Sequence, residues 1–220
     1  MKSTYEYDTD VVMDDGTVIR TTVTNSGDAV KRFLREVYKH GQRLLVGLDT
    51  EWRVIYQKDG RGANRMAVLQ LCMGRRCLVF QIVHANYVPA ALRAFLASPD
   101  HTFVGVAVDG DVERLFYDCK LVVTSAVDLR HVAAEVLSRP ELGRAGLKTL
   151  AREVIGAHVD KQERVTRSKW DRPLSVEQVR YACIDAFVSY EIGRRLLTGQ
   201  RAGDAATGAT IKPFVSFELP

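Results

Sequence analysis

Two carboxylates separated by one residue follow a short apolar run in this sequence. The run is Leu44–Leu48, and the acids are Asp49 and Glu51. If the segment is a β-strand, alternate side chains point to the same face, so both acids lie on one side of it. Two carboxylates at this spacing can share a divalent cation. Taken alone, the motif is equally typical of a strand that ends in solvated acids.

A second acidic motif lies at the start of a predicted helix. The segment Thr102–Ala107 is typical of a strand, and a helical pattern begins at about Gly110, between Asp109 and Asp111. The helix dipole stabilises an acidic residue in the first turn by ~0.3 to 1 kcal/mol, which alone would explain both acids. Asp109 suits the capping position better than a chemical role, so Asp111 is the favoured candidate and Asp109 the alternative.

The third motif combines a phenol and a carboxylate on one helix. Tyr181 and Asp185 are four residues apart, so a helix places them on one face, one turn from each other. The helix is well supported, because Ser175 and Gln178 form a capping box and apolar residues then recur at helical spacing as far as Leu197. The plain alternative is a tyrosine at the edge of the core beside a solvated aspartate.

Together the motifs supply four carboxylates, those of Asp49, Glu51, Asp111 and Asp185. Carboxylates that converge without a cation repel one another and raise each other's pKa, whereas divalent cations turn the cluster into a binding site. Oxygen ligands favour Mg²⁺ or Mn²⁺. Two such ions ~4 Å apart can activate water and stabilise the departing 3′ oxygen of a phosphodiester. The four acids therefore predict a nuclease.

The segments that position these residues change in type along the chain. Asp14–Gly16 lies between two β-prone runs and predicts the turn of an N-terminal β-hairpin. Asp28 is a candidate cap for the helix that follows. Three strands then predict an antiparallel meander, and the alternation of strands and helices after them predicts parallel additions. The predicted strands after the hairpin are 44–48, 66–72, 77–82, 102–107 and 121–124, and the predicted helices are 30–37, 88–96, 110–117, 129–137, 147–154 and 176–197. We expect an α/β fold with a mixed central sheet and helices on both faces.

The composition is that of an ordinary globular protein. The 220 residues are 46% hydrophobic and 26% charged, with a formal net charge of +4. This basic balance is compatible with a polyanionic partner but does not require one. The start of the chain lacks the apolar stretch of a secretory signal, and we expect a soluble intracellular protein. The four cysteines match no zinc or redox spacing, which favours reduced core thiols.

In combination, the three motifs resemble those of the DEDD exonucleases, in the tyrosine-type group that includes the Werner-syndrome-protein-type and ribonuclease-D-type domains. The resemblance implies a ribonuclease-H-like fold, extends over residues 30–197, and looks greatest to the small plant members. The segments that carry it are Asp49–Glu51 for the first motif, Gly105–Asp111 with Leu115 for the second, Tyr181 with Asp185 for the third, and additionally 66–72, 146–150 and 168–174.

The resemblance implies a metal-dependent 3′–5′ exonuclease that releases nucleoside monophosphates from DNA or RNA. By this similarity Asp49 would bridge two ions, Mg²⁺ or Mn²⁺, and Glu51 would bind the ion that activates water. Asp111 would hold the other ion, and Asp185 would complete the site of the first. Tyr181 would orient the attacking water molecule.

The resemblance also leaves two alternatives to consider, the histidine-type subgroup of the family and a catalytically inactive relative. The histidine-type subgroup carries His one residue before the position of Tyr181, and this chain has Arg180 there. A catalytically inactive adaptor that binds nucleic acid with the same fold is the alternative function. All four acids and the tyrosine are present, which favours the enzyme.

Nucleic-acid contacts are predicted at two places. Arg167 and Lys169 precede the third motif, and Trp170 beside them offers an aromatic surface on which a base could stack. The alternative is a solvated loop with Trp170 packed inward. Leu48 and Trp52 flank the first motif and could separate the terminal nucleotide from its neighbour, although both also suit the core.

The chain divides into three parts by its patterns. We expect an N-terminal hairpin extension at 1–27, an exonuclease domain at 28–198, and a flexible C-terminal tail at 199–220 that is rich in Gly, Ala and Thr at its start. The end of the tail could bind a protein partner. Residence in the nucleus or cytoplasm rests on the family resemblance.

Overall fold

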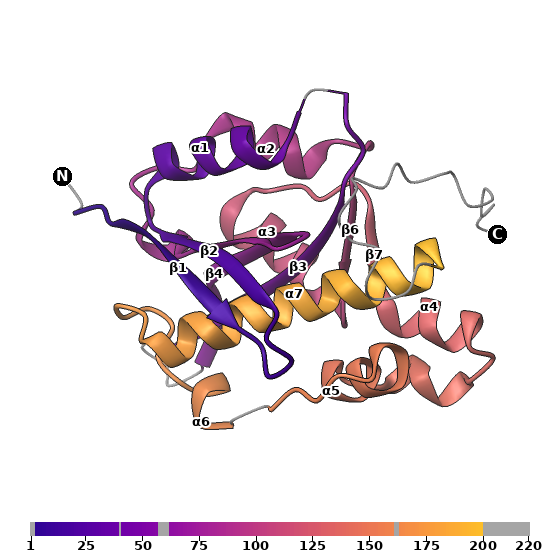
Figure 1. Cartoon of the computed structure of the whole chain (residues 1–220). Coiled ribbons are helices and arrows are strands. Elements are labelled where there is room, and N and C mark those ends of the chain that lie inside the picture. Colours follow the sequence, from indigo (N-terminus) through magenta and orange to yellow (C-terminus); the bar gives the residue numbers. More distant parts are fainter. Residues whose placement is uncertain (1–2, 40, 57–61, 161–162, 200–220) are drawn as a thin grey trace.

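The computed structural model describes residues 3–39, 41–56, 62–160 and 163–199 (Figure 1). Seven strands form one mixed sheet in the order β1-β2-β5-β4-β3-β6-β7. The strands are β1 Glu6–Val12, β2 Val18–Thr24, β3 Leu45–Tyr56, β4 Gly62–Met73, β5 Arg76–Phe80, β6 Thr102–Gly105 and β7 Ala126–Asp128.

The middle of the sheet is the predicted antiparallel meander. Strand β4 pairs antiparallel with both β3 and β5, and β6 and β7 then add in parallel beside β3. The apolar run of β3 is buried on both faces, since Leu45 belongs to one hydrophobic cluster and Val46 and Leu48 to the other. The α/β fold with a mixed sheet is confirmed.

The N-terminal hairpin is also part of this sheet. Strands β1 and β2 are antiparallel, and their turn contains Gly16 with a φ of 82°, which favours glycine. Strand β2 then pairs in parallel with β5. The hairpin therefore forms the edge of the sheet, and its turn lies beside the long helix α7 (Figure 1).

Helices cover both faces of the sheet. Helices α1, α2 and α3 pack on the face that carries Val46 and Leu48, and α4, α5, α6 and α7 pack on the opposite face (Figure 1). Their bounds are α1 Gly27–Val37, α2 Ala90–Ala97, α3 Val108–Cys119, α4 Leu129–Val136, α5 Leu147–Leu150, α6 Glu163–Thr166 and α7 Val176–Thr198; short 3-10 segments lie at Ile82–His84 and Pro140–Arg144, and a π-helical turn at Ala151–Ile155.

Three local predictions are wrong. The strand expected at 121–124 lies at Ala126–Asp128, because those residues align with β6 while Leu121 and Val123 fill the core from an irregular segment. Helix α1 is capped by the Ser26 side chain, and Asp28 lies in its first turn. Helix α3 begins at Val108 after Ala107 in the left-handed conformation, so Asp109 is inside the helix and is not its cap.

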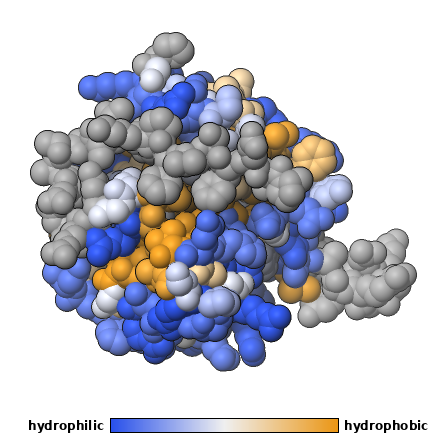
Figure 2. Space-filling model, turned by 90° about the vertical axis from the view of Figure 1, so that its right-hand side faces the viewer, coloured by the Kyte–Doolittle hydropathy of each residue, from blue (hydrophilic) through white to orange (hydrophobic). Residues whose placement is uncertain are grey.

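One face of the molecule is mainly polar. Figure 2 shows this face, on which most coloured side chains are hydrophilic and hydrophobic ones gather near the centre, with smaller groups toward the right-hand edge. Within the residues that the structure describes, no helix has the length and apolar character to cross a membrane. The predicted tail from residue 200 onward lies outside the described residues.

Candidate active site

Strand β3 presents its two acids toward helix α7. Gly47 marks this face, because a Cβ on Gly47 would lie 2.0 Å from the Ala186 carbonyl oxygen of α7. The strand alternates with a period of two, so Asp49 and Glu51 share the face of Gly47. Glu51 is only 6% exposed. The close packing of α7 on Gly47 therefore places both acids under the helix that carries the third motif.

Helix α7 brings the phenol and the last acid to the same place. The predicted capping box is confirmed, with Ser175 accepting from the Gln178 amide and Gln178 accepting from the Ser175 amide. Tyr181 and Asp185 are both buried. Burial raises the pKa of Tyr181 well above its ordinary value, and the negative charges of Asp185 and Glu51 raise that pKa further. The Tyr181 phenol therefore lies close enough to the Asp185 and Glu51 carboxylates for their negative charge to raise its pKa.

Asp111 lies on the other side of β3. Thr50 alternates with its neighbours and faces α3, where its hydroxyl donates a hydrogen bond to the Asp111 carboxylate. Asp111 is 4% exposed. Burial raises its pKa to about 7, an effect that the Thr50 hydrogen bond and the charge of Arg114 partly oppose. Asp109, the other candidate acid of the second motif, is exposed. The difference in burial favours Asp111 as the candidate ligand.

A glycine also determines how α3 approaches the site. A Cβ on Gly105 at the end of β6 would lie 2.7 Å from the Leu48 carbonyl oxygen of β3. The absence of a side chain there lets β6 and the start of α3 pack tightly on β3. The second motif therefore needs Gly105 to bring Asp111 within reach of Thr50.

Two of the four acids lie on β3 and two lie beside it, but they do not form a complete metal-binding site. Across the described ranges, no three His, Cys, Asp or Glu side chains lie close enough together to hold a metal ion. The Asp111 carboxylate is turned to Thr50, on the face of the strand opposite Asp185. The donor set nevertheless fits a hard divalent cation, because it consists of carboxylate oxygens and three of the four side chains are buried.

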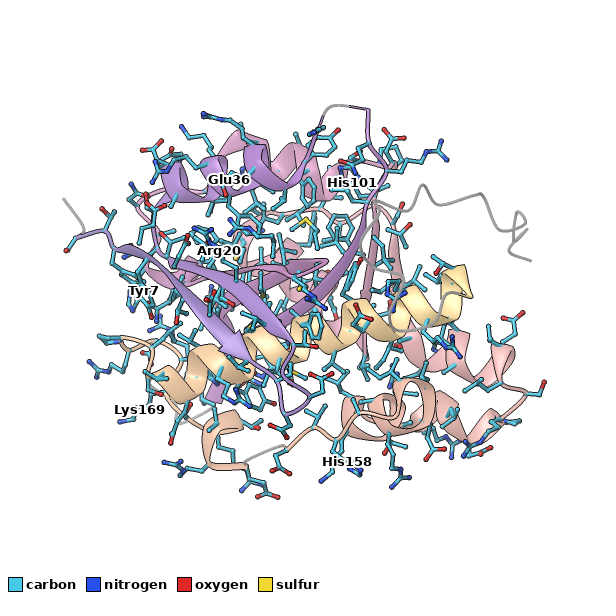
Figure 3. The ribbon with its side chains drawn as sticks, in the orientation of Figure 1. Tyr7, Arg20, Glu36, His101, His158 and Lys169 are labelled. Atoms are coloured by element: carbon cyan, nitrogen blue, oxygen red, sulfur yellow. The ribbon has the colours of Figure 1, made fainter. Side chains whose placement is uncertain are left out.

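A cavity of about 180 Å³ opens beside Tyr181 and Asp185. Its other walls include the hairpin turn, through Met13 and Asp14, and the loop that contains His158. Figure 3 shows His158 below α7 in that view. Arg180 links helix to hairpin by hydrogen bonds to the Val12 carbonyl oxygen and, at 3.4 Å, to Asp14. The cavity is a candidate space for the end of a substrate strand.

Two predicted nucleic-acid contacts are wrong in this structure. Trp170 is 0% exposed, and its indole N–H donates to the Thr166 carbonyl oxygen at 3.3 Å. Its ring lies 6.0 Å from that of Tyr181, centroid to centroid. Trp170 therefore supports Tyr181 from inside the core and offers no surface to a base. Leu48 is likewise fully buried, because it faces the α3 side of the sheet.

The remaining predicted contacts are accessible. Arg167 and Lys169 are exposed, and Lys169 lies at the outer edge of the molecule in Figure 3. Arg167 is 3.6 Å from Glu163, an exposed pair of little energetic weight. Trp52 is half-buried, with the guanidinium carbon of Arg114 4.4 Å from its ring centroid.

The sequence motifs did not single out Thr50 and Gly47. Thr50 lies between the two acids and holds Asp111, while Gly47 allows the close approach of α7. A glycine inside an apolar strand often marks a place where another backbone comes close, and this signal could have identified Gly47. No local pattern identifies the partner of Thr50, which lies 61 residues away.

A mixed sheet of this order, flanked by helices and with buried acids gathered around one strand, defines the class of ribonuclease-H-like α/β proteins. Within it, the chain belongs to the 3′–5′ exonuclease family, which its sequence matches over residues 21–198. Members of this family are nucleases. The resemblance seen in the motifs is therefore confirmed.

Two 3′–5′ exonucleases are similar to this chain over about two thirds of its length. The bifunctional 3′–5′ exonuclease/ATP-dependent helicase WRN of Mus musculus is 32% identical over 154 residues, which are 69% of this chain and 11% of that protein. A 3′–5′ exonuclease of Arabidopsis thaliana is 30% identical over 150 residues, 67% of this chain and 51% of that protein. The chain thus spans about half of the plant relative and a small part of the mouse one.

The fold has solved counterparts. The crystal structure of Trypanosoma brucei RNase D in complex with RNA superimposes with a TM-score of 0.64 at 18% sequence identity. The match covers 84% of this chain and 64% of that one. At this identity the comparison establishes the fold.

Proposed function

We propose that this chain is a divalent-metal-dependent exonuclease that hydrolyses DNA or RNA from the 3′ end and releases nucleoside monophosphates. The observation that carries the proposal is the burial of Glu51, Asp111 and Asp185 around one strand, in a chain of the 3′–5′ exonuclease family. Buried carboxylates are costly without cationic partners. Their retention at one site is best explained by a positive charge that binds there.

Asp49, Glu51, Asp111 and Asp185 would hold two ions, Mg²⁺ or Mn²⁺. Bound ions would supply activation of water and stabilisation of the charge on the departing 3′ oxygen. For all four acids to contribute, the Asp111 carboxylate would have to turn from Thr50 toward the face of β3 that carries Asp49 and Glu51. Asp111 lies in the first turn of α3, so this would be a movement of its side chain or of that turn.

Tyr181 would hold the attacking water molecule. Its raised pKa keeps the phenol protonated at neutral pH, so it acts through hydrogen bonds and is not a general base. The hydroxyl of Thr166 donates to the phenol oxygen at 3.3 Å, and Trp170 packs near the ring. The phenol is therefore held in one orientation before a substrate arrives.

The substrate strand would end in the cavity beside Tyr181. Arg167 and Lys169 are exposed and precede α7, so they are available to contact phosphate groups. The trypanosomal RNase D of similar fold binds RNA. We propose a nucleic-acid strand as the partner, and the C-terminal tail as a binding segment for a further protein.

The proposal is tested with 5′-labelled DNA and RNA strands incubated with Mg²⁺ or Mn²⁺. A ladder that shortens from the 3′ end, and that disappears with a chelator, is the expected result. Asp111→Asn should abolish it, and Asp185→Asn should do the same. Asp109→Asn is the matched control, because Asp109 lies two residues away and is exposed.

Two outcomes would refute parts of the proposal. If the wild-type chain binds the strands and never shortens them, it is the inactive adaptor. If Asp109→Asn abolishes shortening and Asp111→Asn does not, the second-motif ligand is Asp109.

A further inference from the structure

Gln70 is a buried polar side chain that makes no hydrogen bond to the described residues. It is 0% exposed, and neither its amide nitrogen nor its amide oxygen has a hydrogen-bond partner among the residues that the structure describes. A buried polar group left in this state costs roughly 1 to 3 kcal/mol. An apolar residue at this position would avoid the cost, so the amide requires an explanation.

The position of Gln70 in the sheet supplies one. In the antiparallel pairing of β3 and β4, Gln70 lies directly opposite Asp49. Directly opposed residues have Cβ atoms about 4.5 to 5.5 Å apart and share one face of the sheet. The neighbours of Gln70 on this face, Val68 and Cys72, belong to the core cluster that also contains α7. Gln70 therefore faces the same helix as Asp49.

A second buried glutamine in the sheet region shows the contrast. Gln81 follows β5 and is 1% exposed. Its amide oxygen accepts from the Tyr5 hydroxyl at 2.8 Å, and its amide nitrogen donates to the Trp170 and Arg172 carbonyl oxygens at 3.0 and 2.5 Å. A structural glutamine in this protein is fully satisfied, whereas Gln70 is not.

We propose that Gln70 is the positioning residue of Asp49. Its amide N–H donates a hydrogen bond to the Asp49 carboxylate and holds it in the orientation that binds the ion. The inference rests on the proposed metal-dependent function and adds the group that orients one of its ligands. Rotation about side-chain bonds makes the contact, and no backbone movement is needed. Groups that hydrogen-bond a metal-ligating carboxylate change metal affinity about 10- to 100-fold when removed.

The experiment compares Gln70→Met with Gln81→Met. Methionine is close to glutamine in size and carries no amide. Mn²⁺ binding is measured by calorimetry, and thermal unfolding is measured in chelator. For Gln70→Met we expect a Tm equal to or above that of the wild type and a Kd for Mn²⁺ raised about 10- to 100-fold. For Gln81→Met we expect a lower Tm and an unchanged Kd.

A shorter amide provides a second variant if Gln70→Met does not fold. Gln70→Asn keeps the polar group but withdraws it from Asp49, so it should also raise the Kd for Mn²⁺. An unchanged Kd in the folded variant overturns the inference. A Kd raised only in step with a loss of Tm also overturns it, because the role is then structural.

The inference and the proposed function fail in different ways. A wild-type chain that binds no Mn²⁺ overturns both. A wild-type chain that binds Mn²⁺ and shortens strands, with a Gln70→Met variant that binds Mn²⁺ equally well, overturns the role of Gln70 alone.

Discussion

Replacing Asp111 by Asn should stabilise the metal-free protein while removing its activity. The folded protein raises the pKa of Asp111 from 3.8 to about 7, chiefly through burial. The folded state therefore holds this proton more tightly than the unfolded chain does, and ionisation of Asp111 costs stability. The penalty is absent below about pH 4, grows between about pH 4 and 7, and is complete above about pH 7.

The size of the effect follows from the shift. About three pH units at about 1.36 kcal/mol each give an upper limit of about 4 kcal/mol. Asparagine has the same shape, carries no charge, and still accepts a hydrogen bond from Thr50 through its amide oxygen. At about pH 8, Asp111→Asn should therefore raise the free energy of unfolding by as much as about 4 kcal/mol, and at about pH 5 by less than half of that.

Urea unfolding in the presence of a chelator measures both values. Asp109→Asn is the control. Because Asp109 is exposed and lies in the first turn of α3, its replacement should lower the free energy of unfolding by no more than about 1 kcal/mol and should not raise it. If Asp111→Asn does not raise the free energy of unfolding at pH 8, or raises it equally at both pH values, the Asp111 carboxylate is not desolvated. Asp111 would then not be a buried charge that requires a bound cation.

Three further predictions test other parts of the structure. Gly47→Ala should lower the free energy of unfolding by roughly 3 kcal/mol or more, because the new Cβ would lie 2.0 Å from the Ala186 carbonyl oxygen. Chemical denaturation measures this loss, and an unchanged midpoint would contradict the close approach of α7. Tyr181→Phe should lower kcat about 100-fold with the fold intact, as single-turnover rates and circular dichroism would show, and an unchanged rate removes the phenol from the mechanism. Arg167→Ala and Lys169→Ala should each reduce the slope of log affinity against log salt by ~0.7 for a single strand, while Arg152→Ala, at an exposed position on another part of the chain, should leave the slope unchanged.

Much of the site could be predicted from local patterns. The spacing of Asp49 and Glu51 on a strand and of Tyr181 and Asp185 on a helix depends only on the period of each element. The structure places each pair on one face as expected. The capping box at Ser175 is similarly local, and it was predicted correctly.

Predictions failed where a contact between distant segments decided the outcome. Trp170 lies among basic residues in the sequence, yet packing against Tyr181 buries it completely. The last strand begins at Ala126 because pairing with β6 selects that register over the apolar residues before it. Neither outcome can be read from a window of neighbouring residues.

The sequence by itself determined the types of the proposed catalytic residues, the faces on which each pair lies, and the family. Only the tertiary structure decided that Thr50 holds Asp111 on one side of β3 while α7 packs on the other, and that Gln70 lies opposite Asp49. The reason is physical: periodicity fixes directions within one strand or helix, whereas burial and hydrogen bonding depend on which distant segments meet.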